Sequence, residues 1–477
     1  MRFNVLGALL TTIILLLTLL VGSSVTYTTS PKGYGYVELK VKWMVHSDPS
    51  PSADYANAVC GKDEYIYVIG VDTSVDVGQF RVEKRLKSSG ELVKVWVFNP
   101  SGSWDELHDC IIVGNTLYAV GRSGASGIFA WAIVTLDLEL NMLNYTVEDI
   151  SVSRDVAESL TSDGEYLYIT GSDSLPGVGD TQWRVEKRRL DDLTLVKSYT
   201  SNPTRYQDEA LSIYVNPVTG ELWVFGWENV GGWPFWRIEI LSRDLELIRV
   251  VKPGIQGFGY SIEFDEDGNA YIDGPVIAKF DKHGNIVKTA SITADLLLYS
   301  GYFLYAFDLK EVDGVFRHFV HVLDRDLNVI HRMVLDANMS VPASIYARYN
   351  AVFDPGNIFV AGSHGGRGDK MWTVYSISVL ERIVEVITQT VTETLVGTTT
   401  ITIEVVETRT ITETFTITEV RSETVTLPPA TYTITETLTL REPVGGSVFR
   451  VWYLVVAVIL FILGVSVGWW LRRAVKS

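Results

Sequence analysis

Residues 155–171 read DVAESLTSDGEYLYITG, and after a short loop residues 183–203 read WRVEKRRLDDLTLVKSYTSNP. Apolar and aromatic residues alternate with polar ones in four short runs, and this alternation has the period of a β-strand. Steps rich in Gly, Asp and Ser separate the runs and are typical of turns. We therefore expect four short antiparallel strands within about 50 residues.

The same unit recurs across residues 37–380, with copies that begin near Asp54, Asp105 and Asp208. The second strand of each copy ends at one of Gly70, Gly121, Gly171, Gly226, Gly274 and Gly362, with Asp308 in a degenerate copy. Repeated four-stranded units are typical of propeller blades. The sequence therefore predicts an all-β fold, a seven-bladed β-propeller over residues 34–382.

The two ends of the repeat region predict how the ring closes. The last unit lacks an outer strand, because a threonine-rich segment begins where that strand should be. The segment VKWMVHSDP at residues 41–49 resembles VKSYTSNP at residues 196–203, which is an outer strand of the quoted unit. We expect the N-terminal strand to complete the last blade.

Both chain ends are strongly apolar. Residues 1–24 hold an apolar run followed by Gly22, Ser23 and Ser24, a pattern typical of a signal peptide, with an uncleaved anchor as the alternative. Residues 448–471 contain 21 uncharged residues, VWYLVVAVILFILGVSVGWWL, and are expected to span a membrane as one helix. Arg472, Arg473 and Lys476 would keep the tail at 472–477 in the cytoplasm and the N-terminal domain outside.

Residues 383–447 form the threonine-rich segment, in which threonine stands at every second position in several runs. This alternation is a strand period and argues against a helix. Two interpretations are open. The segment is an extended, O-glycosylated spacer, or it folds back or pairs with other copies into a β-rich stalk that makes the protein a homo-oligomer. This segment is the predicted stalk, and the anchor follows it.

The repeats resemble the SBBP-type surface propeller repeats, which begin with Asp-x-Ala-x-Ser and contain a Tyr-Val-x-Gly strand and a Lys-x-x-x-x-Gly hairpin. The matching segments are 208–212, 269–274 and 278–285. The overall layout, with a stalk and a C-terminal anchor, is similar to that of archaeal cell-surface proteins associated with S-layers. The resemblance implies a propeller at a cell surface and says little about its activity.

The formal charge of −17 argues against nucleic acid as a partner, because phosphates need basic surfaces. The two cysteines, Cys60 and Cys110, fall on neighbouring inner strands and are either bridged or two buried thiols. Asn144 and Asn338 stand in N-glycosylation sequons, which fit a translocated chain.

Candidate ligand-binding residues gather at the start of the inner strands. Asp54, Asp105, Asp155 and Asp208 should ring one mouth of the channel, with Glu106, Asp109, Glu158 and Glu209 nearby. Oxygen ligands of this kind suit calcium, the one cofactor that the pattern allows, while the alternative is turn chemistry that recurs because blades are copies. We expect no catalytic residues and no other metal site.

Two aromatic residues and four basic ones complete the predictions. Trp227 and Trp233 should be exposed in the fourth blade, where they suit stacking on sugar rings. Lys84, Arg85, Lys187 and Arg188 should be solvated on third strands.

Three functional hypotheses remain. The first is a non-enzymatic module that binds a protein or glycan partner outside the membrane. The second is a surface hydrolase or lyase that acts at the channel mouth, and a close pair of acidic residues with a raised pKa there would favour it. The third is a structural component of a surface layer.

Overall fold

The computed structural model describes residues 31–73, 77–125, 128–151, 154–174, 180–312, 315–335, 351–354, 356–366, 369–387, 389–395, 399–405 and 421–426. A compact unit over residues 35–382 separates from a second unit that contains the strands after residue 388. Within the ranges given, no helix is long and apolar enough to cross a membrane. The predicted signal peptide (1–24) and spanning helix (448–471) lie outside the described residues.

The larger unit consists of seven four-stranded sheets, so the predicted seven blades are confirmed. In each blade the strands run from an inner to an outer position. Blade 1 contains β2 (Tyr55–Lys62), β3 (Tyr65–Asp72), β4 (Gln79–Leu86) and β5 (Leu92–Phe98). Blade 2 contains β6 (Trp104–Val113), β7 (Thr116–Ala125), β8 (Ile128–Asp137) and β9 (Met142–Glu148). Blade 3 contains β10 (Val156–Ser162), β11 (Tyr166–Ser174), β12 (Thr181–Arg189) and β13 (Leu195–Ser201).

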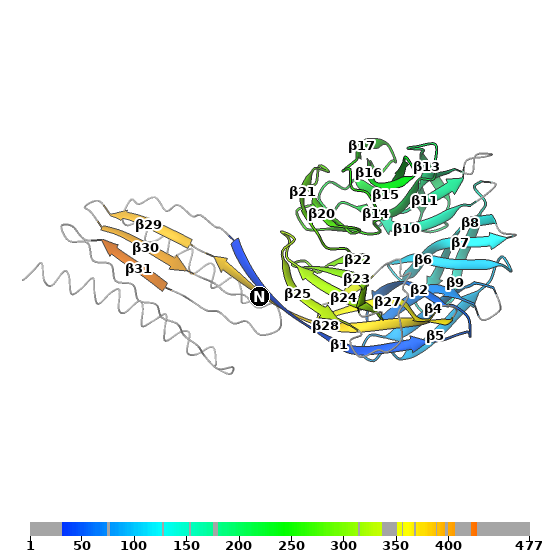
Figure 1. Cartoon of the computed structure of the whole chain (residues 1–477), viewed down its shortest axis with the longest axis horizontal. Coiled ribbons are helices and arrows are strands. Elements are labelled where there is room, and N and C mark those ends of the chain that lie inside the picture. Colours follow the sequence, from blue (N-terminus) through cyan, green and yellow to red (C-terminus); the bar gives the residue numbers. More distant parts are fainter. Residues whose placement is uncertain are drawn as a thin grey trace, which may run out of the picture. The chain divides into compact units, whose positions relative to one another are not determined.

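The next three blades have the same order. Blade 4 contains β14 (Glu209–Val215), β15 (Leu222–Val230), β16 (Trp233–Leu241) and β17 (Leu247–Val251). Blade 5 contains β18 (Ile262–Phe264), β19 (Ala270–Ile272), β20 (Ile277–Phe280) and β21 (Ile286–Ala290). Blade 6 contains β22 (Leu296–Tyr299), β23 (Leu304–Val312), β24 (Val315–Leu323) and β25 (Val329–Val334). Successive inner strands contact one another in a closed cycle around the centre (Figure 1).

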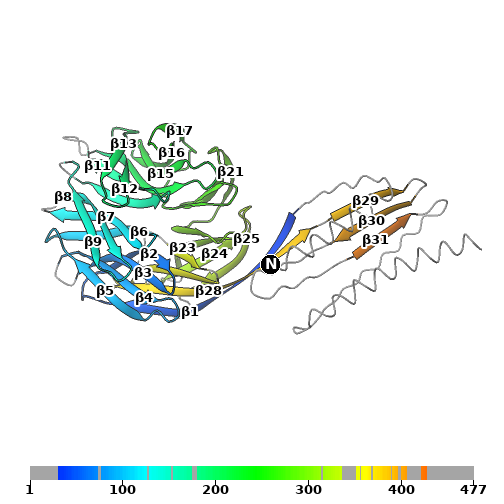
Figure 2. The ribbon, with the colours of Figure 1, turned by 180° about the vertical axis from the view of Figure 1, so that it is seen from behind.

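The seventh blade is built from both ends of the propeller chain. Its order is β26 (Ala351–Asp354), β27 (Asn357–Gly366), β28 (Asp369–Ile387) and then β1 (Pro31–Ser47), which lies beside β28 (Figure 2). Ser378 donates a hydrogen bond to the carbonyl of Lys40 at 3.1 Å. The ring of Trp43 lies 5.8 Å from that of Phe359 between their centroids. The predicted closure by the N-terminal strand is therefore confirmed.

Neighbouring blades are joined by a repeated contact that starts from a tryptophan of the third strand. Trp183 donates its indole N–H to the carbonyl of Trp227 in the next blade at 3.2 Å. Arg237 of that next blade lies over the Trp183 ring at 5.9 Å from its centroid. Trp131 and Trp372 make the same pair of contacts with the blades that follow them. Because Trp372 belongs to blade 7 and reaches blade 1, the seam is packed like the other joints.

The prediction that four basic residues of the third strands are solvated is wrong. Their exposed fractions are only 2% for Lys84, 4% for Arg85, 7% for Lys187 and 2% for Arg188. The third strand is sandwiched between blades, and the chain supplies countercharges there. Arg85 pairs with the fully buried Glu83 at 2.7 Å, and Lys84 reaches Glu139 of the next blade at 2.7 Å. Buried charges persist when they are paired in this way.

The second unit contains a three-stranded antiparallel sheet from the threonine-rich segment. Its strands are β29 (Gln389–Leu395), β30 (Thr399–Val405) and β31 (Arg421–Thr426). Their register pairs Thr392 with Thr402 and Thr402 with Thr424. The described part of the segment thus folds back on itself, while its glycosylation and its role in oligomer formation stay predictions.

Candidate functional site

Four inner strands carry a β-bulge at the same place. The strand register slips after Ala56 in β2, Leu107 in β6, Ala157 in β10 and Ala210 in β14. A bulge leaves one extra residue outside the ladder and bends the strand. The extra residues are Asn57, His108, Glu158 and Leu211.

Tyr260 occupies the equivalent position in blade 5. Ile213 pairs with Val224, two residues before Gly226, and Ile262 likewise pairs with Ile272, two residues before Gly274. Counting back by two residues therefore aligns Tyr260 with Leu211. We call the set Asn57, His108, Glu158, Leu211 and Tyr260 the bulge row.

The bulge also explains the repeated glycine of the second strand, which the sequence placed at the strand's end and which lies two to four residues before that end in blades 1 to 4. A β-carbon at Gly226 would stand 2.0 Å from the carbonyl oxygen of Glu209, and one at Gly171 would stand 1.9 Å from that of Val156. Gly70 and Gly121 face the same close approach. The backbone of the bulged strand fills the space that a side chain would need, so only glycine fits.

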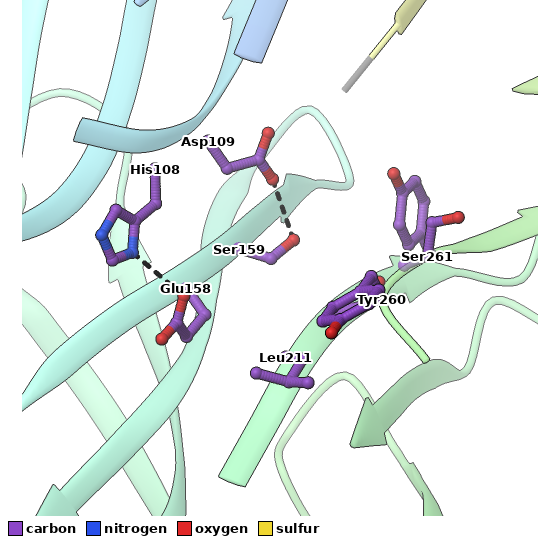
Figure 3. A pocket seen from close by; sticks show the side chains of 9 residues that line it. His108, Asp109, Glu158, Ser159, Leu211, Tyr260 and Ser261 are labelled. Carbon is purple, nitrogen blue, oxygen red and sulfur yellow. Dashed lines mark hydrogen bonds and ion pairs between the residues drawn. The ribbon is translucent and has the colours of Figure 1, made fainter. Parts of the chain in front are cut away.

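Four members of the bulge row, all except Asn57, and residues that follow them surround a hollow of about 430 Å³, a volume that includes open solvent. Figure 3 shows His108 turned toward Glu158 and Asp109 turned toward Ser159, with Tyr260 and Ser261 on the chain across the hollow. Blades 2, 3, 4 and 5 all contribute to the lining. The lining residues are His108, Asp109, Glu158, Ser159, Leu211, Ser212, Tyr214, Tyr260 and Ser261.

His108 is buried between two carboxylates. Its Nδ1 lies 3.0 Å from Oε2 of Glu158 in the next blade, and its Nε2 lies 3.7 Å from Oε2 of Glu106. Burial acts to lower the pKa of His108, but Glu158 and Glu106 outweigh it and raise the pKa above its ordinary value. The imidazole therefore bridges carboxylates of blades 2 and 3.

Glu106 is held ionised by several donors. Burial acts to raise its pKa, but His108, Arg122 and Trp104 together hold the pKa well below its ordinary value. The guanidinium of Arg122 lies 2.7 Å from Oε2, and the indole N–H of Trp104 donates to the same oxygen at 3.0 Å. Asn57 of blade 1 donates to the other oxygen at 3.0 Å. Glu106 therefore contacts His108 and is not itself part of the lining of the hollow.

Asp109 presents a carboxylate that is oriented by the adjacent blade. Ser159 donates to its Oδ2 at 2.9 Å, and the backbone N–H of Leu160 donates to the same oxygen at 3.3 Å. The N–H of Cys110 donates to Oδ1 at 2.8 Å. Donors from two strands therefore fix the rotamer of Asp109 at the edge of the hollow.

The opposite side of the channel holds groups that stay neutral at pH 7. Burial raises the pKa of Tyr214 well above its ordinary value, and the charge of Glu263 adds to the shift. Burial also raises the pKa of Glu263 to about 8. A hydrogen bond with the backbone of Tyr299 acts to lower this pKa but is outweighed. A protonated carboxyl and a phenol both donate hydrogen bonds. The lining therefore offers the carboxyl groups of Asp109 and Glu158 on one side and the phenol of Tyr214 on the other, with Glu263 close to that phenol but outside the lining.

The four aspartates predicted as ligand residues are fully buried at the start of the inner strands. Asp208 accepts hydrogen bonds from the N–H of Thr204 and of Asn229, both at 2.8 Å. Asp54 likewise accepts from the hydroxyl of Ser50 and the N–H of Thr73. Asp105 and Asp155 make the same two kinds of bond. They therefore tie each incoming loop to the end of a second strand, and a ligand role for them stays a prediction.

The two predicted aromatic residues differ in their surroundings. Trp233 is 62% exposed at the tip of the β15–β16 hairpin, in line with the prediction. Trp227 is only 8% exposed, so the prediction that it is exposed is wrong. Its ring is covered by Phe258, whose edge meets it at 5.4 Å between centroids. Phe258 itself is 47% exposed and was not predicted.

The remaining predicted residues lie on blades 1 and 2. Cys60 and Cys110 form a disulfide that joins these blades, with Cα atoms 6.1 Å apart. Asn144 is exposed on β9, and Asn338 lies outside the described residues. In the part of the chain that the structure describes, no group of three or more His, Cys, Asp or Glu side chains could hold a metal ion.

Sequence patterns found only part of the hollow. Asp109 and Glu158 were expected near the channel mouth and do line it. His108, Leu211 and Tyr260 were missed, because a bulge breaks the two-residue period from which strand faces are inferred. The signal that could have found them is the third residue after Asp54, Asp105, Asp155 and Asp208, which differs in every copy.

No protein-family model matches the chain, and no curated protein matches it. Solved structures do match. BamB from Moraxella catarrhalis is 12% identical, with a TM-score of 0.41, over 71% of this chain and 99% of that one. Virginiamycin B lyase from Staphylococcus aureus is 10% identical, with a TM-score of 0.43, over 71% and 99%. Sqt1 from Chaetomium thermophilum is 12% identical, with a TM-score of 0.42, over 68% and 83%.

Proposed function

We propose that this chain is a non-enzymatic binding module displayed outside the cell membrane, and that the hollow at the bulge row holds part of its partner. The observation that carries the proposal is the bulge itself. In blades 1 to 4 it takes one residue of the inner strand out of the ladder, and that position holds a different side chain in each of the four. A channel with a purely structural role would not require different side chains at these positions.

The lining indicates which partners fit. Asp109 and Glu158 accept hydrogen bonds, Ser159 and Ser212 can donate and accept, and Tyr214 is a neutral donor. Carboxylates at the hollow repel anions and attract amines, and they also accept bonds from hydroxyl groups. The hollow therefore suits a glycan or a basic side chain of a protein partner.

Display outside the membrane is supported by the two chain ends. The apolar stretch within residues 1–24 suits export, and the 21 uncharged residues within 448–471 suit an anchor. The threonine-rich segment between propeller and anchor would set the distance from the membrane. We keep this localisation as part of the proposal.

Binding is tested with a panel of neutral glycans, amino sugars, uronic acid polymers and basic peptides, measured by calorimetry against the purified propeller (residues 31–387). We expect neutral or cationic compounds to bind and uronic acid polymers to be rejected. The Glu158→Gln variant should lose affinity, because it removes a charge and breaks the contact with His108. Full affinity in this variant, or binding confined to polyanions, would contradict the proposal.

One observation favours a second candidate, a surface hydrolase or lyase. Burial raises the pKa of Glu263 to about 8, so this carboxyl keeps its proton at pH 7, as a general acid must. Glu263 does not itself line the hollow, but its charge acts on Tyr214, which does, and the carboxyl groups of Asp109 and Glu158 in the lining could act as the base. The two candidates share the hollow and differ in whether a bound ligand is cleaved.

Cleavage is tested by incubating the same glycan panel with the propeller from about pH 5 to pH 9 and following new reducing ends and unsaturated products. A catalytic Glu263 predicts activity that the Glu263→Gln variant lacks and that falls as the pH rises past about 8. Ligands that bind and are recovered intact would leave the binding module as the function.

A further inference from the structure

The loop between β17 and β18 connects the rim of blade 4 to the hollow. On the outer side, the N–H of Trp236 donates to the carbonyl of Ile255 at 2.9 Å, and the N–H of Gly257 donates to that of Pro234 at 3.0 Å. On the inner side, the N–H groups of Tyr260 and Ser261 donate to the carboxylate of Asp273 at 2.6 and 3.0 Å. We call residues 257–261 the track.

Glycine residues and a buried carboxyl hold the track in one conformation. Gly257 has a φ of +130°, which L side chains rarely adopt. A β-carbon at Gly259 would meet the carbonyl of Asp273 at 2.3 Å. The hydroxyl of Ser261 donates to Asp273 at 2.6 Å and accepts the N–H of Leu297 at 3.0 Å. The two aromatic residues of the track, Phe258 and Tyr260, are therefore fixed by their backbone.

Aromatic side chains lie near both ends of the track. Trp233 precedes Pro234, to which the track is bonded, and is 62% exposed. Phe258 is 47% exposed and rests edge-on against the buried Trp227. Tyr260 lines the hollow beside Leu211 (Figure 3). Three rings thus lead from the surface of blade 4 into the channel.

The surroundings of these rings favour a sugar chain over an apolar protein segment. Trp233 pairs with the exposed Val230, while Gly231, Gly232 and Gln256, which neighbour the rings in the chain, are exposed and add no large apolar surface. Single aromatic faces suit the apolar faces of sugar rings, while the oxygens of Asp109 and Glu158 suit their hydroxyls. The same carboxylates disfavour acidic sugars.

We propose that the ligand is a linear, neutral oligosaccharide whose terminal sugar lies at the open side of the hollow, with its hydroxyls toward the lining, and whose following sugars stack on Phe258 and Trp233 along the track. This inference rests on the proposed function and specifies its ligand. It assigns the hollow and the rim different roles. The hollow binds the chain end, and the rim adds affinity only for ligands long enough to reach it.

The test compares disaccharides with hexasaccharides of glucose and of N-acetylglucosamine, using the full chain in a detergent without sugar headgroups. We expect the hexasaccharide to bind more tightly than the disaccharide. Trp233→Ala and Phe258→Ala should each weaken the hexasaccharide about tenfold and leave the disaccharide within about twofold. Tyr302→Ala is the matched control, because Tyr302 is a 38% exposed aromatic in the β22–β23 turn, at the other end of an inner strand.

The outcomes separate the two proposals. If both rim variants bind the hexasaccharide as tightly as the parent chain, or weaken both sugars equally, the track is not a glycan path and the inference fails. If basic peptides bind in a manner sensitive to Glu158→Gln while neutral sugars do not, the inference fails and the proposed site stands. If Glu158→Gln binds every compound like the parent chain, the hollow is not the site and the proposed function fails.

Discussion

Gly226 tests the bulge at the scale of one residue. The Gly226→Ala variant must push a β-carbon against the carbonyl of Glu209, which stands 2.0 Å from it. We expect a loss of unfolding free energy on the order of 3 kcal/mol or more, because backbone on both sides cannot move without breaking the ladder. Chemical denaturation of the propeller measures this loss.

Gly164→Ala is the matched control for that variant. Gly164 has a φ of +88°, but its β-carbon would meet nothing within 4 Å. We therefore expect only the backbone cost of about 1–2 kcal/mol. Equal losses in the two variants would show that the close approach, and with it the bulge, is wrong.

Glu263 gives a pH dependence whose sign follows from its raised pKa. The folded carboxyl keeps its proton up to about pH 8, whereas the unfolded one ionises near 4.5. A raised folded pKa means that stability is complete below the unfolded value and is lost as the pH rises through the folded value. We expect Glu263→Gln to match the parent near pH 4 and to gain stability relative to it between about pH 5 and 8.

Denaturation at several pH values measures this difference between variant and parent. His108 also has a raised pKa, because Glu158 and Glu106 outweigh its burial, and it titrates equally in both proteins. Its contribution therefore cancels when the two are compared. A difference that is flat with pH would mean that Glu263 is ionised like an ordinary surface carboxyl.

At the scale of the element, the tryptophan of the third strand makes the contacts that join one blade to the next. Trp183→Phe removes the indole N–H and leaves the carbonyl of Trp227 without that donor. An unsatisfied buried carbonyl costs about 1–3 kcal/mol, and the smaller ring adds a packing loss. We expect thermal unfolding to shift down accordingly, while the same substitution at the exposed Trp233 changes it little.

Strand patterns predicted the elements well because period and turn chemistry are local properties. The number of blades, the order of the strands and the closure of the ring by residues 41–49 could all be inferred from copies of one unit. The surroundings of a strand are not local. Lys84 and Arg188 sit in polar, charged runs, and only the packing of one blade on the next shows that their charges are buried and paired.

The candidate site was harder to predict for a related reason. A bulge shifts the face of each side chain that precedes it, so His108 could not be assigned to the channel from alternation. Tyr260 lies outside the assigned strands, so no strand period places it. Phe258 was missed because neither a motif nor a period distinguishes an aromatic residue of a loop.

At the scale of the whole molecule, closure depends on β1. Deleting residues 31–48 removes the outer strand of blade 7 and exposes the ring of Phe359 at the seam. We expect a large drop in the unfolding temperature, because the apolar joint between blades 7 and 1 loses Trp43 and Val45. A synthetic peptide of residues 31–48 should restore part of it, and unchanged unfolding would contradict the closure.

The disulfide between blades 1 and 2 makes a separate contribution. Its loop spans 50 residues, for which the chain-entropy model gives about 4 kcal/mol at most. We expect the Cys60→Ser, Cys110→Ser double variant to lose about 2–4 kcal/mol relative to the oxidised parent and to match the reduced parent. Free thiols titrated in the unfolded, unreduced parent would show that no bridge forms.

The position of β28 within its sheet also decides how the propeller bears load. The chain leaves blade 7 along β28, which has β27 on one side and β1 on the other. A pull from the C-terminal side therefore acts along a strand held by two ladders, so both must shear at once instead of an edge strand peeling off bond by bond. Under the proposed C-terminal anchoring, load would enter the propeller along this doubly paired strand.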